Sequence, residues 1–182
     1  MNAIQILVSE HDQILTMIRI VETILSSDDE GALPVDDLHN LIDFIRNFAD
    51  KYHHLKEEDV LFAEMGNYGM SHDSGPIAVM LHEHNQGRDY IRNASESLAL
   101  YEAGDVTAVA DIRFNLLSYA ELLTNHIQKE NRILYPMAEK LLPVQVIDTM
   151  TQNFVLANAT TLNNEYNEKY LKMVTKLSLK YL

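Results

Sequence analysis

An internal repeat constrains the fold of this chain more than any other feature of its sequence. The segment SEHDQ (residues 9–13) is echoed by HEHNQ (82–86), and HHLKEEDVLF (53–62) is echoed by HIQKENRILY (126–135), both at an offset of 73 residues. Each copy carries a histidine that is followed, 42 positions later, by His-x-x-x-Glu. Because two separate segments share one offset, we expect two halves with the same local structure.

Apolar residues recur at helical spacing along most of the chain, and no segment of useful length alternates in the manner of a β-strand. With only 6 Gly and 4 Pro, the sequence has few of the turn residues that an all-β fold needs. The stretches SSDDEGALPVDD and GNYGMSHDSGP interrupt the helical pattern. The expected helices cover residues 2–26, 35–65, 76–102, 106–141 and 144–182, the last with an interruption near residues 157–161.

These helices predict an all-α fold in one chain of 182 residues, a length that suits a single full hydrophobic core. The short connections favour an up-down-up-down four-helix bundle in residues 1–141. Residues 142–182 are expected to form an additional C-terminal helical extension that packs on the bundle or on a partner.

Composition excludes several functions. The absence of cysteine rules out disulfides, thiolate zinc sites, cysteine-ligated clusters and thiol catalysis. A formal net charge of −13 argues against nucleic acids and anionic membranes as partners, because both attract clustered Lys and Arg. The opening MNAIQILVSEHDQIL lacks the basic flank of a signal peptide, and no apolar run approaches the ~18 residues of a membrane span. We therefore expect a cytoplasmic protein.

The repeat also selects a set of metal ligands. On an α-helix, residues four apart lie about 40° apart in azimuth, so a histidine and a glutamate at this spacing can meet one metal ion. The segment YHHLKEEDVLF offers two such pairs, one beginning at His53 and one at His54. Only the first pair has a counterpart in the second copy, because His54 aligns with Ile127. The predicted ligands are His11, His53, Glu57, His84, His126 and Glu130.

This donor set indicates the kind of metal and the number of ions. Four imidazoles and two carboxylates without a thiolate suit iron, manganese or zinc. The two-fold pattern favours two ions bridged by the glutamates, since two buried carboxylates would repel each other without cations between them. Six ligands leave room for a bridging oxide or hydroxide and for an external ligand such as a diatomic gas or peroxide. The apolar neighbours of these residues predict a mostly dry pocket.

Several neighbouring residues have more than one interpretation. We expect His54 and Glu58 to face solvent or to contact the ligands rather than to bind metal. His82 lies about 200° from His84 around the helix, so it is expected to face outward, with a role as a fifth ligand as the alternative. We expect Tyr119 to be a core tyrosine with a satisfied hydroxyl group; a hydrogen bond to a ligand or a radical site is the alternative.

The segments YHHLKEEDVLF, GPIAVMLHEHNQGRDYI and HIQKENRILYPMAEK resemble the hemerythrin-like, or HHE cation-binding, family. The resemblance covers most of residues 1–141, and residues 144–182 resemble the tails of bacterial members. It implies an up-down four-helix bundle with a non-haem di-iron centre held by the six ligands named above. Family members bind dioxygen or nitric oxide, sense oxygen or iron, or help to repair iron–sulfur clusters.

The function expected from this resemblance is binding or sensing of dioxygen, nitric oxide or peroxide at the di-iron centre. The alternatives are a di-iron oxidase or peroxidase-type enzyme, and iron storage or delivery including iron–sulfur cluster repair. Met80 stands where oxygen carriers have a fifth histidine, which argues against reversible oxygen carriage. Repair members carry a cysteine-bearing segment, and this sequence has no cysteine. A redox partner or a second subunit completes the expected set of partners.

Overall fold

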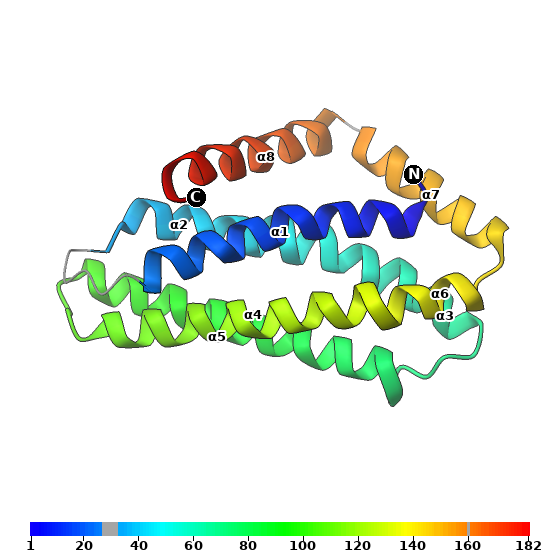
Figure 1. Ribbon diagram of the computed structural model, residues 1–182, viewed down its shortest axis with the longest axis horizontal. Helices are drawn as coiled ribbons and strands as arrows, with labels where there is room; N and C mark the ends of the chain where they lie inside the picture. Colours follow the sequence, from blue (N-terminus) through cyan, green and yellow to red (C-terminus); the bar gives the residue numbers. More distant parts are fainter. Residues whose placement is uncertain (27–32, 160) are drawn as a thin grey trace.

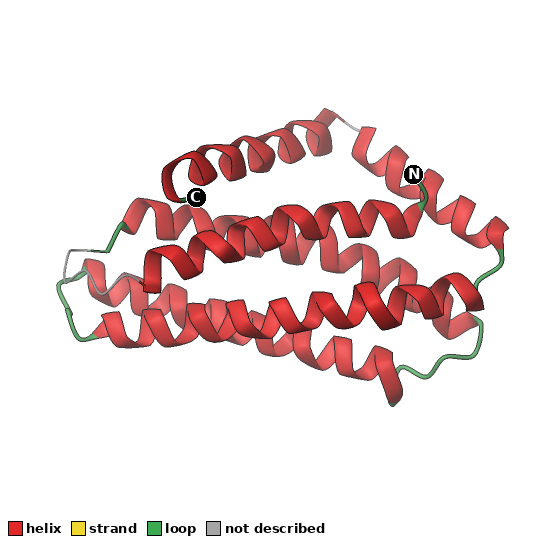
Figure 2. Ribbon diagram, viewed as in Figure 1, coloured by secondary structure: helices red, strands yellow, loops and turns green. Residues whose placement is uncertain are grey.

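The computed structural model describes residues 1–26, 33–159 and 161–182, and none of these residues forms a β-strand (Figure 2). No helix in these ranges is both long and apolar enough to cross a membrane. The elements, in chain order, are α1 (Ala3–Ser26), α2 (Val35–Phe44), the π-helical segments η1 (Ile45–His54) and η2 (Glu57–Phe62), α3 (Ala63–Asn67), α4 (Gly75–Glu102), α5 (Ala108–Lys129), the π-helical η3 (Glu130–Leu134), α6 (Tyr135–Leu141), α7 (Val144–Ala159) and α8 (Thr161–Tyr181).

Four long helical rods form the bundle (Figure 1). The first rod is α1, the second runs without a break from α2 to α3, the third is α4, and the fourth runs from α5 to α6. Successive rods run in opposite directions, and α5 packs against both α4 and α1. The predicted all-α, up-down-up-down bundle with a C-terminal helical addition is therefore confirmed.

The rods end where the local sequence favours an end. The second rod begins with Asp36 and Asp37 in its first turn, where carboxylates interact favourably with the helix dipole. α4 ends at Glu102, and Gly104, two residues beyond, has a φ of +102° that suits glycine. The N–H groups of Gly104 and Asp105 then satisfy the last carbonyls of the helix, each at 3.0 Å, in a Schellman arrangement.

Two predicted breaks fall partly on positions outside the described residues. The first is the loop SSDDEGALPVDD, which includes residues 27–32, and the second is the interruption near residues 157–161, which includes residue 160. α7 ends at Ala159 and α8 begins at Thr161.

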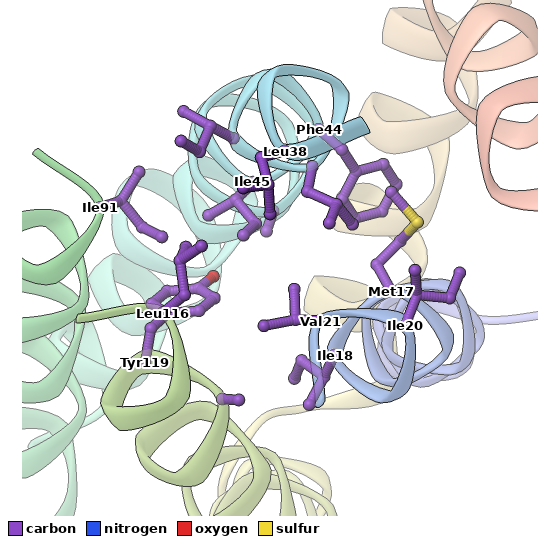
Figure 3. Packing of buried hydrophobic residues seen from close by; sticks show 14 of the residues in the cluster. Met17, Ile18, Ile20, Val21, Leu38, Phe44, Ile45, Ile91, Leu116 and Tyr119 are labelled. Carbon is purple, nitrogen blue, oxygen red and sulfur yellow. The ribbon is translucent and has the colours of Figure 1, made fainter. Parts of the chain in front are cut away.

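Two apolar clusters fill the bundle, with a layer of buried polar residues between them. One cluster lies between α1, α2, α4, α5 and α8 and includes Ile18 and Leu116 (Figure 3). The other lies toward η2, α6 and α7 and includes Leu61 and Leu134. His11 falls between the two clusters on α1, and the buried histidines and glutamates of the other rods fall at the same level. The packing of both clusters thus fixes the polar layer.

The C-terminal extension packs against the outside of α1, with further contacts to α2 (Figure 1). The backbone N–H of Ala3 donates to the hydroxyl of Thr151 on α7 at 2.8 Å. At the other end, Lys180 and Tyr181 of α8 donate to Asp37 of α2 at 2.5 and 2.6 Å. The extension therefore contacts the bundle near Ala3 at one end and near Asp37 at the other.

Candidate metal centre

The six predicted ligands meet in the middle of the bundle, and all four rods contribute to them. All six side chains are at most 2% exposed. The Nε2 atoms of His11 and His53 lie 2.9 Å apart, and those of His84 and His126 lie 3.0 Å apart. Each copy of the repeat therefore supplies one histidine pair, and the two pairs lie within one buried layer.

The two glutamates lie between the histidine pairs. Oε2 of Glu130 is 3.2 Å from Nε2 of His11, and its Oε1 is 3.1 Å from Nε2 of His126. Oε2 of Glu57 lies 3.7 Å from Nε2 of His53 and 3.6 Å from Nε2 of His84. Each carboxylate thus reaches one histidine of each pair, which is the arrangement that a bridging carboxylate requires.

Each of the four histidines donates the N–H of Nδ1 to an oxygen atom on a neighbouring rod. The acceptors obey the repeat, because Glu10 and Glu83 are 73 positions apart, as are Glu58 and Asn131. A lysine pairs with each of the first two acceptors. The four contacts are His53 to Glu10 (2.9 Å), His126 to Glu83 (2.9 Å), His84 to Glu58 (2.6 Å) and His11 to Asn131 (2.9 Å).

These contacts prepare the centre for a cation. A neutral imidazole with its proton on Nδ1 presents a lone pair at Nε2. In each pair two such lone pairs face each other at 2.9 or 3.0 Å, which requires a proton or a metal ion between them. Oε2 of Glu57 and both oxygens of Glu130 are buried and accept no hydrogen bond from the residues that the structure describes.

The spacing of the nitrogens also matches a coordination sphere. Bonds from a metal such as zinc to histidine nitrogen are about 2.1 Å long, and around an octahedral ion with bonds of this length two nitrogens at right angles lie about 3.0 Å apart. The separations in both histidine pairs agree with this value. The donor set and the unsatisfied carboxylate oxygens therefore fit a metal centre.

Without a metal, the centre must take up protons. Burial and the charge of Glu130 raise the pKa of Glu57 well above its usual range. Burial acts in the same direction on Glu130, but the charge of His126 holds the pKa of Glu130 well below its usual range. Burial disfavours the charged form of His126, yet Glu130 and Glu83 raise its pKa to about 9. Protons and metal ions should therefore compete for the same buried atoms.

His54 has a more central position than the sequence predicted. It is buried rather than solvent-facing, and its ring stacks on that of His84 with centroids 3.9 Å apart. Its side chain belongs to a group with Glu57, His84 and His126 whose nitrogen and oxygen atoms all lie within 4.8 Å of one another. A second group of the same kind contains His11, His53, Glu57 and Glu130.

The π-helical turns explain why His54 faces inward. In η1 each backbone hydrogen bond joins residues five positions apart instead of four, so the rod rotates by a smaller angle per residue than an α-helix does. Adjacent residues such as His53 and His54 can then both face the interior. A prediction based on α-helical azimuth separates them too far.

Tyr135 is a contact of the centre that the repeat does not reveal. Its hydroxyl donates to Oε1 of Glu57 at 2.6 Å and lies 3.3 Å from Nε2 of His11. Phe62 occupies the equivalent position in the other copy and stacks near His84, with ring centroids 6.1 Å apart. The first half of the centre therefore has a phenol group where the second half has only an apolar ring.

The other candidates have distinct positions. Oε1 of Glu58 accepts a hydrogen bond from Nδ1 of His84 and another from Arg88 at 2.7 Å. Both contacts agree with a role outside the ligand set. His82 is exposed, as expected. Tyr119 is buried as predicted, but its hydroxyl has no hydrogen-bond partner among the described residues, so the expected satisfied hydroxyl is wrong.

A helical bundle with a buried, duplicated histidine and glutamate cluster defines a class of metal-binding proteins. The family model of the hemerythrin HHE cation-binding domain matches residues 2–138, so the chain belongs to that family. No curated protein and no solved structure matches the chain. The match ends before α7, so it does not include the C-terminal extension.

Proposed function

We propose that the protein holds two iron ions with a bridging oxide or hydroxide at this centre and binds or senses dioxygen, nitric oxide or peroxide there. Nitrogen and oxygen donors also suit manganese and zinc, which are the alternative metals. The observation that carries the proposal is the convergence of four histidine Nε2 atoms on two carboxylates, three of whose four oxygens accept no hydrogen bond from the described residues.

The residues divide between two metal positions, and Glu57 belongs to both groups. One ion would be held by His11, His53, Glu57 and Glu130, and the other by His54, Glu57, His84 and His126. Oε1 of Glu130, at 3.1 Å from His126, is close enough to serve the second position as well. Iron would supply a redox-active Lewis acid with an open coordination position for a small ligand.

The surrounding residues orient the ligands and keep water out. The Nδ1 acceptors hold each ring with its Nε2 toward the centre, an outer layer of contacts that usually raises metal affinity. Tyr135 fixes one oxygen of Glu57. The apolar side chains of Leu61, Phe62 and Leu134 close one side of the layer, so polar contacts inside it are strong.

A second candidate is a di-iron oxidase or peroxidase-type enzyme, and the position of Tyr135 favours it. A buried phenol that loses an electron must also release its proton, and Oε1 of Glu57 accepts that hydrogen bond. The sequence had suggested Tyr119 for this role, but Tyr119 makes no hydrogen bond with the described residues.

The test is an optical spectrum of the anaerobically reduced, iron-loaded protein before and after addition of dioxygen or nitric oxide. A ligand-dependent and reversible spectral change is expected. Steady consumption of peroxide would instead support the enzyme. Ready loss of metal to a chelator without either response would overturn both candidates and favour iron storage or delivery.

A further inference from the structure

A cavity of about 160 Å³ lies beside the candidate metal centre, between η1, α4 and α5. His54, His84 and His126 line it on the side of the centre. A cavity needs a volume on the order of 10–15 Å³ to hold one water molecule, and a cavity of about 150 Å³ can hold benzene. The cavity is therefore large enough for a small organic molecule and exceeds the need of a diatomic gas.

The interior of the cavity has apolar walls. Ile45, Ile91 and Leu123 line it together with the ring of Tyr119, and Figure 3 shows this part of the bundle. Gly87 lies in the middle of α4, where glycine is less favourable than alanine. A Cβ atom at this position would lie 3.3 Å from Cε2 of Tyr119. The glycine therefore allows the tyrosine ring to lie against the backbone of α4.

Two polar groups in the lining make no hydrogen bond with the residues that the structure describes. The hydroxyl of Tyr119 has no partner in the described part of the chain, although the residue is only 3% exposed. Nδ1 of His54 likewise has no hydrogen-bond partner among the described residues, and the carboxylate of Asp50 lies 3.5 Å from it. Buried polar groups are nearly always hydrogen-bonded in folded proteins. A bound molecule with a polar group would supply the missing partner.

The outer rim of the cavity carries cations, although the chain has a net charge of −13. Three of the six arginines in the sequence, Arg46, Arg88 and Arg92, line this one cavity. Arg88 is already engaged by two carboxylates at 2.7 Å. Arg92 forms an exposed ion pair with Asp89, and exposed Arg46 pairs with no acid among the described residues.

The acids in the lining do not cancel these charges. Asp50 accepts hydrogen bonds from Arg88, and Glu83 is paired with Lys129 and His126. Arg46, and Arg92 in exchange for its exposed partner Asp89, can therefore bind a ligand at the rim. The planar guanidinium group of arginine binds a carboxylate through two parallel hydrogen bonds.

We propose that this cavity binds a small organic monocarboxylic acid whose carboxylate faces Arg46 and Arg92 and whose opposite end faces Tyr119. The apolar walls receive the body of the molecule, and the tyrosine hydroxyl pairs with a hydroxyl or carbonyl group at its far end. A molecule in this position lies next to the histidines of the second metal position. The inference goes beyond the diatomic or peroxide ligand proposed above and does not depend on it.

The test is calorimetric titration of the protein as purified, with four probes that separate the contributions. These are 4-hydroxybenzoate, benzoate, benzyl alcohol and acetate. We expect benzoate to bind about tenfold more tightly than benzyl alcohol or acetate, because only benzoate has both the ring and the charge. 4-Hydroxybenzoate should bind more tightly still, and the substitution Tyr119→Phe should remove that advantage over benzoate.

Matched variants identify the cavity as the site. The double variant Arg46→Gln/Arg92→Gln should weaken benzoate about tenfold and leave benzyl alcohol unchanged. The control double variant Arg19→Gln/Arg132→Gln changes the net charge equally at exposed positions outside the cavity and should have no effect. Leu122→Trp, at a half-buried position of the lining, should block all ring-containing probes.

Three results would overturn the proposal. One is the absence of saturable heat with benzoate. Another is equal loss of benzoate affinity in the two double-arginine variants, which would indicate a general charge effect. The third is equal binding of benzoate and benzyl alcohol, which would show that the cavity takes neutral molecules. None of these results bears on the iron content of the protein, so the metal proposal is tested separately.

Discussion

Tyr135 donates a hydrogen bond of 2.6 Å from its hydroxyl group to Oε1 of Glu57. The equivalent residue of the other copy is Phe62, which has no hydroxyl group, so this contact breaks the two-fold pattern of the centre. The two metal positions therefore differ in their surroundings, although the repeat supplies them with similar ligands. The difference has a measurable consequence even without metal.

Replacing Tyr135 by phenylalanine should lower the free energy of unfolding of the metal-free protein by about 1–3 kcal/mol, because Oε1 of Glu57 loses its partner in a buried site. The matched control is Tyr119→Phe, which removes a buried hydroxyl that has no partner among the described residues. That variant should be within about 0.5 kcal/mol of the original or more stable. Urea unfolding measures both values. Equal losses would show that the Tyr135 contact carries no special weight.

Glu57 and its neighbour Glu58 should respond differently to the same substitution. Glu57→Gln removes a carboxylate that belongs to both metal groups, so most of the metal should be lost. Glu58→Gln keeps an oxygen that can accept the Nδ1 proton of His84, so metal should remain, with affinity lowered about 10–100-fold at most. Metal analysis after gel filtration decides between them. The reverse order of metal loss would mean that the repeat assigns the wrong pair.

His54 offers a test of the second metal position. If it holds metal with Glu57, His84 and His126, then His54→Gln should weaken one of two binding steps and leave the other intact. Exposed His82 provides the control, and His82→Gln should leave both steps unchanged. Stepwise titration of metal-free protein with ferrous iron under anaerobic conditions resolves the steps. Two unchanged steps in the His54 variant would exclude this residue from the ligand set.

The contact between α8 and α2 should depend on pH. Burial acts to raise the pKa of Asp37, but hydrogen bonds from Lys180 and Tyr181 hold it below its usual value of 3.8. Because the folded-state pKa is lowered, this contact stabilises the fold fully above pH 3.8 and is lost as the pH falls through the lowered value. Asp37→Asn should therefore speed hydrogen exchange at the end of α8 at neutral pH.

The control for this experiment is the same comparison in acid. At a pH below the lowered folded-state pKa of Asp37, the two proteins should exchange at similar rates, since Asp37 is then protonated in both the folded and the unfolded chain. A rate difference that is independent of pH would show that the charge of Asp37 does not hold α8.

The bundle and the grouping of the six candidate ligands could be predicted from the sequence because duplicated segments adopt the same local geometry. His11 and His84, for example, occupy equivalent places in their helices because the residues around them repeat. The same repeat contains Glu10 and Glu83, which accept hydrogen bonds from His53 and His126. A prediction based on the histidines alone did not include these two residues.

Three other features of the structure could not be predicted from the spacing of apolar residues. A π-helical turn changes the azimuth of a few residues without altering the periodicity of a 30-residue rod, so the inward position of His54 could not be predicted. Tyr135 aligns with Phe62, and both appear as core aromatics in sequence. The contact of Lys180 with Asp37 spans 143 residues, and only the packing of α8 brings the two together.

The most direct test of the central claim is the metal content of protein produced in iron-replete cells. About two iron ions per chain are expected, with nearly complete loss in the double variant Glu57→Gln/Glu130→Gln, whose side chains keep their size but lose both central charges. Fewer than about one transition-metal ion per chain in the unaltered protein would contradict the proposed two-metal centre.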